Sequence, residues 1–335
     1  MLERMFYEMV RDDLQNRAKV MDMKGTVHLE TMVKHNDIIL TGVTFNRGDG
    51  IPCPIVYLNH YYEEYDNGAS YVDMIKELFS LMTESPEAVR MSFPDSDYEK
   101  VRGKVYTRIC GYDQNQKWLE DKVHEKHGDF AYTYQLFAGE MDHAIGTVAI
   151  CSKHLKYWGI SEETLKRDAV ENDKKEEVRL VDMKEMMFEQ IGFWKAENLY
   201  EMEGERWPED DDPILYVLTN KNRTYGASLL ARPDVLEHTA KVLGGDYYVL
   251  PSSIHETILI SKKNSPPLDK LLEMVYEINR SAVDPAEVLS DHIQYYDHKN
   301  KLLMNAQEYV AKQQMTKNGM AGQVVVNRQR DCVAR

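Results

Sequence analysis

The spacing of apolar residues predicts helices and short strands along the first half of the chain. Apolar side chains recur every three or four positions in residues 2–19 and 69–85, which is the period of a helix packed on one face. Between them, β-rich runs at residues 26–34 and 38–46 flank the polar triplet His35-Asn36-Asp37, which predicts a β-hairpin. A short helix is expected at residues 114–126. Further strands are expected at residues 54–59, 104–112, 130–137 and 144–152.

The second half of the chain shows the same mixture of periods. A helix ended by two glycines is expected at residues 235–245, and a second helix, introduced by two prolines, at residues 267–279. A final hairpin is expected over residues 291–305. Strands are expected at residues 214–220, 247–250 and 257–260.

Residues 183–194 read MKEMMFEQIGFW and are rich in methionine. Met183, Met186, Met187 and Ile191 fit one helical face, and we interpret this face as part of the core. Methionine stripes also form adaptable binding grooves, so a groove is the alternative.

These patterns predict an α+β protein made of two lobes, with mostly antiparallel sheets and helices packed on them. The composition changes at the charged stretch NDKKEEVR, residues 172–179, which we interpret as the lobe boundary. An N-terminal lobe is therefore expected at residues 1–178 and a C-terminal lobe at residues 179–312. Residues 313–335 lose the apolar period and are expected to be a disordered tail.

The net charge limits the kinds of partner that are expected. The chain of 335 residues carries a net charge of −15, and its pI is near 5.2. This balance argues against direct nucleic-acid binding and against anionic membranes, because both attract basic surfaces. It allows a protein partner with a basic face.

The cysteines and the N-terminus indicate a cytoplasmic protein. The four cysteines show no zinc-binding spacing, and free thiols in a reducing compartment are the simplest interpretation. The first residues are too charged for a signal peptide, and no apolar stretch approaches the length of a membrane span. Glycine-rich phosphate-binding motifs are absent from the sequence as well, so no cofactor is expected.

The segment PSSIHE, residues 251–256, offers the first candidate site because it separates two apolar strands. Ser252 and Ser253 lack the G-x-S-x-G context of a serine nucleophile, and Leu259 stands where a zinc-binding HExxH motif needs histidine. His255 and Glu256 would point to opposite faces of a strand. A structural turn is therefore the favoured interpretation. A loop that binds a ligand or a partner is the second, and catalysis is the third.

The segment TNKNRTYGAS, residues 219–228, is the second candidate because loops after strands often build sites. Asn220, Arg223 and Ser228 are suited to anion binding, but the same residue types also cap helices and close turns. No catalytic residue is predicted. The predicted binding residues from the two loops are Asn220, Arg223, Ser228, Ser252, Ser253, His255 and Glu256.

Histidines and tyrosines supply weaker candidates. His124, His127 and Asp129 have a loose metal-like spacing, as do His292 and His298, but neither group has a convincing third ligand nearby. We interpret these histidines as surface residues and predict no metal site. Tyrosines at positions 61, 62, 65, 295 and 296 suit either a contact surface or a half-buried core.

Four segments, at residues 51–75, 154–172, 216–230 and 249–260, together carry a resemblance to a known family. In this order they resemble an uncharacterised domain family of gut anaerobic bacteria, often found on mobile elements. More remotely, the chain is similar to an uncharacterised family typified by a Bacillus cytoplasmic protein. In that family a proline-containing loop with other polar residues replaces LPSSIHE, which implies that the strand–loop–strand shape matters more than the serines. Neither resemblance implies catalytic residues.

The sequence leaves three functions open. The leading expectation is a non-enzymatic interaction or regulatory protein, of mobile-element origin, whose partner is a protein. The second is a hydrolase-like enzyme that uses loops 219–228 and 252–256. The third is an acidic nucleic-acid mimic that acts against a host defence system.

Overall fold

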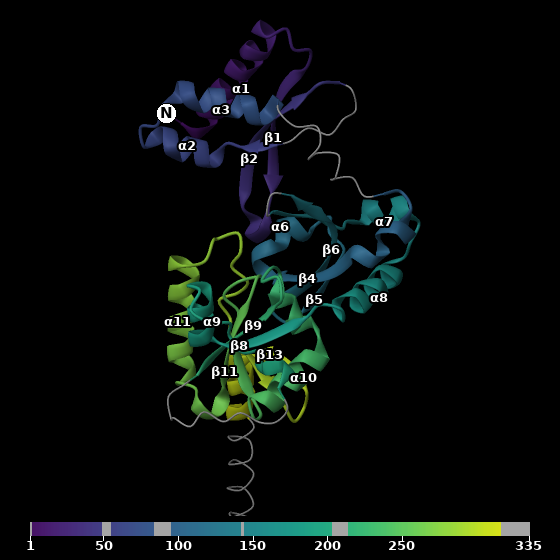
Figure 1. Ribbon diagram of the computed structural model, residues 1–335, viewed down its shortest axis with the longest axis vertical. Coiled ribbons are helices and arrows are strands. Elements are labelled where there is room, and N and C mark those ends of the chain that lie inside the picture. Colours follow the sequence, from purple (N-terminus) through teal and green to yellow (C-terminus); the bar gives the residue numbers. More distant parts are fainter. Residues whose placement is uncertain (1, 49–54, 84–94, 142–143, 203–213, 316–335) are drawn as a thin grey trace, which may run out of the picture. The chain divides into compact units, whose positions relative to one another are not determined.

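The computed structural model of the chain (Figure 1) describes residues 2–48, 55–83, 95–141, 144–202 and 214–315. These residues form two compact units. The first comprises residues 1–106, 114–123 and 134–172, and the second comprises residues 107–113, 124–133 and 173–335. The fold is α+β, as predicted, and every strand pairing described within its sheets is antiparallel.

The first unit begins with a small sheet covered by helices. Its strand order is β1-β2-β3, with β1 at Thr26–Val33, β2 at Ile39–Asn46 and β3 at Val56–Tyr57. The predicted hairpin is confirmed, because β1 and β2 pair from Thr26–Asn46 to Val33–Ile39. Its core is formed with α1, Glu3–Val20, α2, Asn59–Asp66, and α3, Tyr71–Thr83.

A second core of the first unit contains Tyr98, Val105, Trp158 and Leu165. It draws on the helices α5, Tyr98–Val101, α7, Ser152–Trp158, and α8, Glu162–Asp173. Ser161 caps α8, because its hydroxyl accepts a hydrogen bond from the Thr164 backbone N–H at 3.2 Å.

A four-stranded sheet contributes residues to both units. Its order is β4-β6-β5, and β7 pairs with β6. Its strands are β4, Val105–Gly111, β5, His124–His127, β6, Phe130–Met141, and β7, Ala144–Ala149. The helix expected at residues 114–126 is wrong in extent: α6 covers only Gln116–Leu119, and His124–His127 pair with β6 as strand β5.

The second unit is built on a six-stranded sheet of order β13-β12-β10-β11-β9-β8. Its strands are β8, Val178–Asp182, β9, Leu215–Asn220, β10, Tyr247–Leu250, β11, Thr257–Ser261, β12, Gln294–Asp297, and β13, Leu302–Asn305. The sequence predicted all of them except β8, which lies within and just after the stretch interpreted as a lobe boundary.

Helices cover both faces of this sheet, so its strands are apolar on both sides. Leu259 of β11 packs in the same core as α10, Pro233–Val242, whereas its neighbours Ile258 and Ile260 pack with α11, Leu268–Ser281. α9, Met183–Gln190, packs against Val181 and Val217. Residues 306–315 are helical and pack beside α11.

The predicted lobes, residues 1–178 and 179–312, remain a prediction. The two units described above have other limits. Of the expected disordered tail, residues 316–335 lie outside the described residues, and residues 313–315 end a helix. In the parts of the chain that the structure describes, we find no helix with the length and apolar character of a membrane span.

Candidate functional site

The loop after β9 is closed by its own polar side chains. The Asn220 side chain donates to the backbone oxygen of Thr224 at 2.8 Å and accepts from its N–H at 3.2 Å. Arg223 and Tyr225 both have positive φ, at 52° and 56°. This conformation is strained for residues other than glycine, so the closing bonds are needed to hold it. Asn220 is buried and serves the loop itself.

The loop between β10 and β11 is likewise held by backbone contacts. The Ser253 hydroxyl accepts the His255 N–H at 3.0 Å, and the Ile254 N–H donates to the Glu287 backbone oxygen at 2.9 Å. Ser252 accepts the Leu289 N–H through its own backbone oxygen, at 3.2 Å. The serine hydroxyl of Ser253 therefore completes a turn, in agreement with the favoured sequence interpretation.

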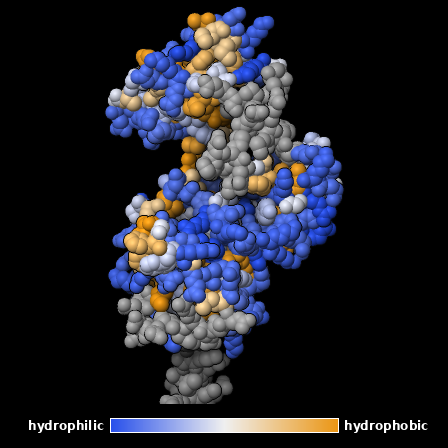
Figure 2. All heavy atoms as spheres, in the orientation of Figure 1, coloured by the Kyte–Doolittle hydropathy of each residue, from blue (hydrophilic) through white to orange (hydrophobic). Residues whose placement is uncertain are grey.

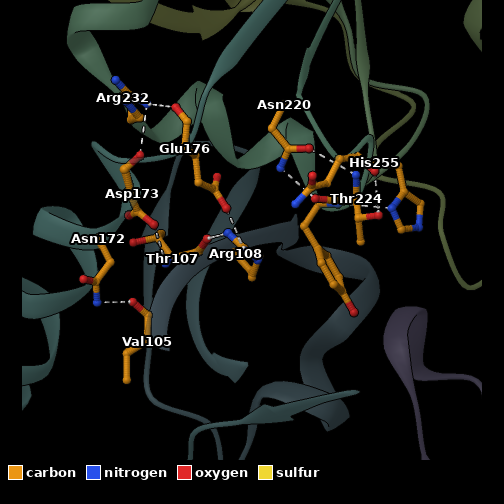
Figure 3. A network of polar contacts seen from close by, with 12 residues as sticks. Val105, Thr107, Arg108, Asn172, Asp173, Glu176, Asn220, Thr224, Arg232 and His255 are labelled. Carbon is orange, nitrogen blue, oxygen red and sulfur yellow. Dashed lines mark hydrogen bonds and ion pairs between the residues drawn. The ribbon is translucent and has the colours of Figure 1, made fainter. Parts of the chain in front are cut away.

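His255 joins these two loops, which lie far apart in the sequence (Figure 3). Its ring Nδ1 accepts the Tyr225 N–H at 3.1 Å. Its backbone oxygen accepts the Gly226 N–H at 3.0 Å and the Thr219 hydroxyl at 2.9 Å. A Cβ on Gly226 would lie 2.6 Å from that oxygen, so the approach requires glycine.

The hydrogen bond from the Tyr225 N–H also determines which ring nitrogen of neutral His255 carries the proton. Because Nδ1 accepts a hydrogen bond, the ring proton of neutral His255 sits on Nε2. Nε2 lies 3.2 Å from Oε1 of Glu287, so its N–H faces that carboxylate. Both ring nitrogens are thus engaged in contacts that hold the loops, and the imidazole has no free lone pair for use as a base.

Arg223 of the first loop and Arg179 of β8 form a partly buried network with Glu189 of α9. Glu189 lies 2.9 Å from the guanidinium of Arg179 and 2.8 Å from that of Arg223. Burial alone would raise the pKa of Glu189, but the hydrogen bond from Arg179 and the positive charges of Arg179, Arg223 and Lys195 outweigh burial and lower it. Burial raises the pKa of Glu256, and the charges of Arg223 and His255 oppose that rise.

The remaining residues predicted to bind a ligand, Ser228 and Ser252, are each only 6% exposed. Among the residues that the structure describes, the Ser228 hydroxyl has no hydrogen-bond partner. The structure therefore brings the two predicted loops together, but it places their polar groups mainly in contacts with one another.

A second polar network in this unit was missed by the sequence interpretation (Figure 3). The Asp173 carboxylate accepts the Thr107 N–H at 3.0 Å, and Arg108 pairs with Glu176 at 3.0 Å. Arg232 donates to the backbone oxygens of Asp173 and Glu176. Burial raises the pKa of Asp173 to about 6. No local motif could have revealed this network, because its members come from segments about 65 residues apart.

Of the residues considered for metal binding, Asp129 of the first group and His292 of the second lie close together. The Asp129 carboxylate accepts hydrogen bonds from Gln294 and Asn305, each at 2.7 Å, and lies 3.5 Å from the ring of His292. Throughout the described ranges, no group of three or more histidine, cysteine, aspartate or glutamate side chains is arranged to hold a metal ion. Asp129 instead ties the turn between β5 and β6 to the six-stranded sheet.

The largest departure from the sequence interpretation lies at the end of α9. Met186 is buried as predicted, but Met187 is 63% and Ile191 67% exposed, so their assignment to the core is wrong. The helix ends at Gln190, and Gly192 turns the chain with a φ of 78°. We call the exposed side chains that result the apolar cluster: Met187, Phe188, Ile191, Phe193 and Trp194.

The aromatic rings of the apolar cluster contact one another. The ring centroids of Phe188 and Trp194 lie 4.8 Å apart, those of Phe188 and Phe193 6.1 Å, and those of Phe193 and Trp194 6.2 Å. Hydrophobic atoms gather over the region where Figure 1 places α9 and α11 (Figure 2). Of the tyrosines considered as a surface, Tyr295 and Tyr296 are buried, whereas Tyr61, Tyr62 and Tyr65 are half-buried against a core of the first unit.

Comparison with known proteins places the chain in a family without assigning it an activity. No curated protein and no solved structure matches. A family model described as a family of unknown function (DUF5688) matches residues 3–298, which is nearly the whole chain. The expectation of an uncharacterised family is confirmed to that extent, and the chain belongs to this family of unknown function, DUF5688.

Proposed function

We propose that this protein acts without catalysis, by binding another protein through the apolar cluster. The observation that carries the proposal is the exposure of three mutually contacting aromatic rings, those of Phe188, Phe193 and Trp194. Contiguous exposed apolar groups on a soluble domain mark interaction sites, and aromatic residues are enriched where partners contact each other.

The polar groups of the two loops form hydrogen bonds within and between the loops, which supports a non-enzymatic role. A serine hydrolase needs a hydroxyl within reach of a basic ring nitrogen. Here the Ser253 hydroxyl accepts from the backbone of His255, and the ring Nδ1 of His255 accepts from Tyr225. A regulatory role, a cytoplasmic location and an origin on a mobile element remain predictions that go with this proposal.

A selection from a displayed peptide library tests the proposal. The full-length protein serves as bait, and the double variant Phe193→Ser/Trp194→Ser is used for counter-selection. We expect peptides with aromatic or aliphatic anchors, with a Kd in the micromolar range for the wild type and at least about tenfold weaker binding to the variant.

A matched control uses exposed apolar residues elsewhere. Val72→Ser/Leu81→Ser removes side chains that are 63% and 47% exposed on α3 and should leave peptide binding unchanged. If no peptides are enriched, or if those obtained bind both double variants equally well, the apolar cluster is not a binding surface and the proposal is wrong.

A further inference from the structure

The helix at residues 306–315 is fixed at its first turn. The Asn305 side chain caps it by accepting the Gln307 N–H at 2.9 Å and the Glu308 N–H at 3.2 Å. The same side chain donates to the Asp129 carboxylate at 2.7 Å, in the turn between β5 and β6. The start of the helix is therefore tied to the body of the second unit.

Beyond its first turn, this helix buries little. Ala306 is fully buried, and Tyr309 is half-buried against the core that contains α11. Val310 is half-buried as well, whereas residues 311–315 are all exposed. α11, in contrast, buries side chains in three successive turns. Segments with few buried apolar contacts open locally at a lower free energy than the rest of a fold.

Tyr309 packs on a second tyrosine and beside a positive charge. The rings of Tyr309 and Tyr295 are stacked, with centroids 4.1 Å apart. The Lys262 ammonium lies 4.5 Å from the centroid of Tyr295 and 5.2 Å from that of Tyr309, so it contacts both rings as a cation. These contacts attach the middle of the helix to the six-stranded sheet.

The ring beneath Tyr309 is held by bonds that do not involve the helix. The Lys262 ammonium donates to the Tyr295 hydroxyl at 2.7 Å, and this hydroxyl donates to the Asp246 carboxylate. Asp246 also accepts the His298 backbone N–H at 3.0 Å. We call Asp246, Lys262 and Tyr295 the Tyr295 site. Its three side chains hold one another, and Tyr309 adds a ring on top of them.

We infer that residues 306–315 form a releasable latch over the Tyr295 site. In the closed state the Tyr309 ring covers that of Tyr295, which is fully buried. In the open state the helix leaves the surface beyond its cap at Asn305, while the mutual bonds of the Tyr295 site persist. The fold thus contains a conformational device that hides or exposes an aromatic ring beside an ammonium group. This device lies apart from the apolar cluster and does not rest on the proposed function.

Hydrogen exchange of the full-length protein, followed by mass spectrometry at a series of low urea concentrations, tests the opening. We expect the amides of residues 310–315 to exchange about 10-fold to 100-fold more slowly than in an unfolded chain, with little dependence on urea. The amides of α11 should be protected at least about 1,000-fold and should follow global unfolding. The inference is overturned if residues 310–315 also follow global unfolding, or if they exchange as fast as an unfolded chain.

Variants of the full-length protein test the role of Tyr309. Tyr309→Ala removes the stacked ring and should lower the protection of residues 310–315 by about fivefold to tenfold. Tyr309→Phe keeps the ring and should retain the protection to within about twofold. Gln307→Ala, an exposed change in the same helix, is the matched control and should also retain it. Equal protection in Tyr309→Ala and Gln307→Ala would show that this ring does not hold the helix, and the latch would be refuted.

Hydroxyl-radical footprinting tests what the latch covers. Oxidation of Tyr295 should rise severalfold in Tyr309→Ala and stay at the wild-type rate in Tyr309→Phe. Tyr247, which is buried in the same sheet, and Tyr276, which is exposed on α11, should keep their rates in both variants. An unchanged rate for Tyr295 in Tyr309→Ala would mean that the helix does not cover this ring. A parallel rise at Tyr247 would mean that the unit opens as a whole. Either result would overturn the inference.

Discussion

His255 illustrates how a residue suited to catalysis can serve architecture. Its ring accepts the Tyr225 N–H through Nδ1 and faces Glu287 through Nε2, and its backbone oxygen receives two further bonds, from Gly226 and Thr219. Because both ring nitrogens and the backbone oxygen of His255 are engaged, this residue holds the two loops in one relative position. The strained backbone at Tyr225 depends on that hold.

Replacing His255 by alanine should therefore destabilise the protein. The Tyr225 N–H would lose its acceptor, and we expect the free energy of unfolding to fall by about 1–2 kcal/mol and the Tm by roughly 2–6 °C. Urea denaturation and calorimetry measure both quantities. Asn222→Ala, at an exposed position in the same segment, is the control and should change neither. An unchanged Tm for His255→Ala would mean that the histidine is held for another purpose.

Asp173 makes stability depend on pH in an unusual direction. Burial raises its pKa to about 6, above the value of an unfolded aspartate. Between about pH 4 and pH 6 the folded state therefore binds more protons than the unfolded state, and the contribution of Asp173 to stability falls as pH rises through this range.

Asp173→Asn should remove that contribution. The asparagine oxygen can still accept the Thr107 N–H, so the fold is kept. Because the variant lacks the titrating carboxyl, its free energy of unfolding should rise relative to that of the wild type by up to about 2–3 kcal/mol between pH 4 and pH 7. Urea denaturation at several pH values gives the difference. Glu277→Gln, an exposed change on α11, should show no such trend. A constant difference across this range would contradict the buried, protonated state of Asp173.

The loop pair shows what local sequence could and could not indicate. The apolar runs of β10 and β11 around PSSIHE predicted two strands and a turn, and that turn exists. Its meeting with residues 219–228 follows from the pairing of β11 with β9 in the six-stranded sheet. That pairing joins segments about 40 residues apart and has no local signature.

α9 and β8 show why two elements were misjudged. The apolar period through Ile191 predicted burial, but the helix ends at Gln190 and the glycine turn leaves the residues after it exposed. β8 was concealed because its first residues, Val178 and Arg179, belong to a charged run, although the strand pairs with β9. Tertiary pairing overrode composition in this strand.

The close packing of the loops predicts a sharp sensitivity at Gly226. A Cβ there would lie 2.3 Å from the Thr219 hydroxyl oxygen and 2.6 Å from the His255 backbone oxygen. Gly226→Ala should cost about 2–3 kcal/mol of unfolding free energy, measured by urea denaturation. Gly103→Ala, where a Cβ meets nothing within 4 Å, is the control. Equal stabilities for the two variants would show that the loops are free to separate.

The net charge of −15 affects the stability of the molecule as a whole. Like charges on a compact chain repel one another, and salt screens that repulsion. We expect the Tm to rise by a few degrees between about 50 mM and 500 mM sodium chloride. A fall in Tm would mean that the ion pairs on the surface outweigh the general repulsion.

Across the whole molecule, we assign opposite roles to two regions: the polar loops hold the fold, and the apolar cluster is the proposed binding surface. One calorimetric comparison tests this assignment most directly, with His255→Ala and Phe193→Ser/Trp194→Ser measured beside the wild type under the same conditions. We expect a lower Tm for His255→Ala and an unchanged Tm for the double variant, because Phe193 and Trp194 are 70% and 52% exposed. The reverse order would contradict this assignment, since the aromatic residues would then belong to the core and His255 would be free for another function.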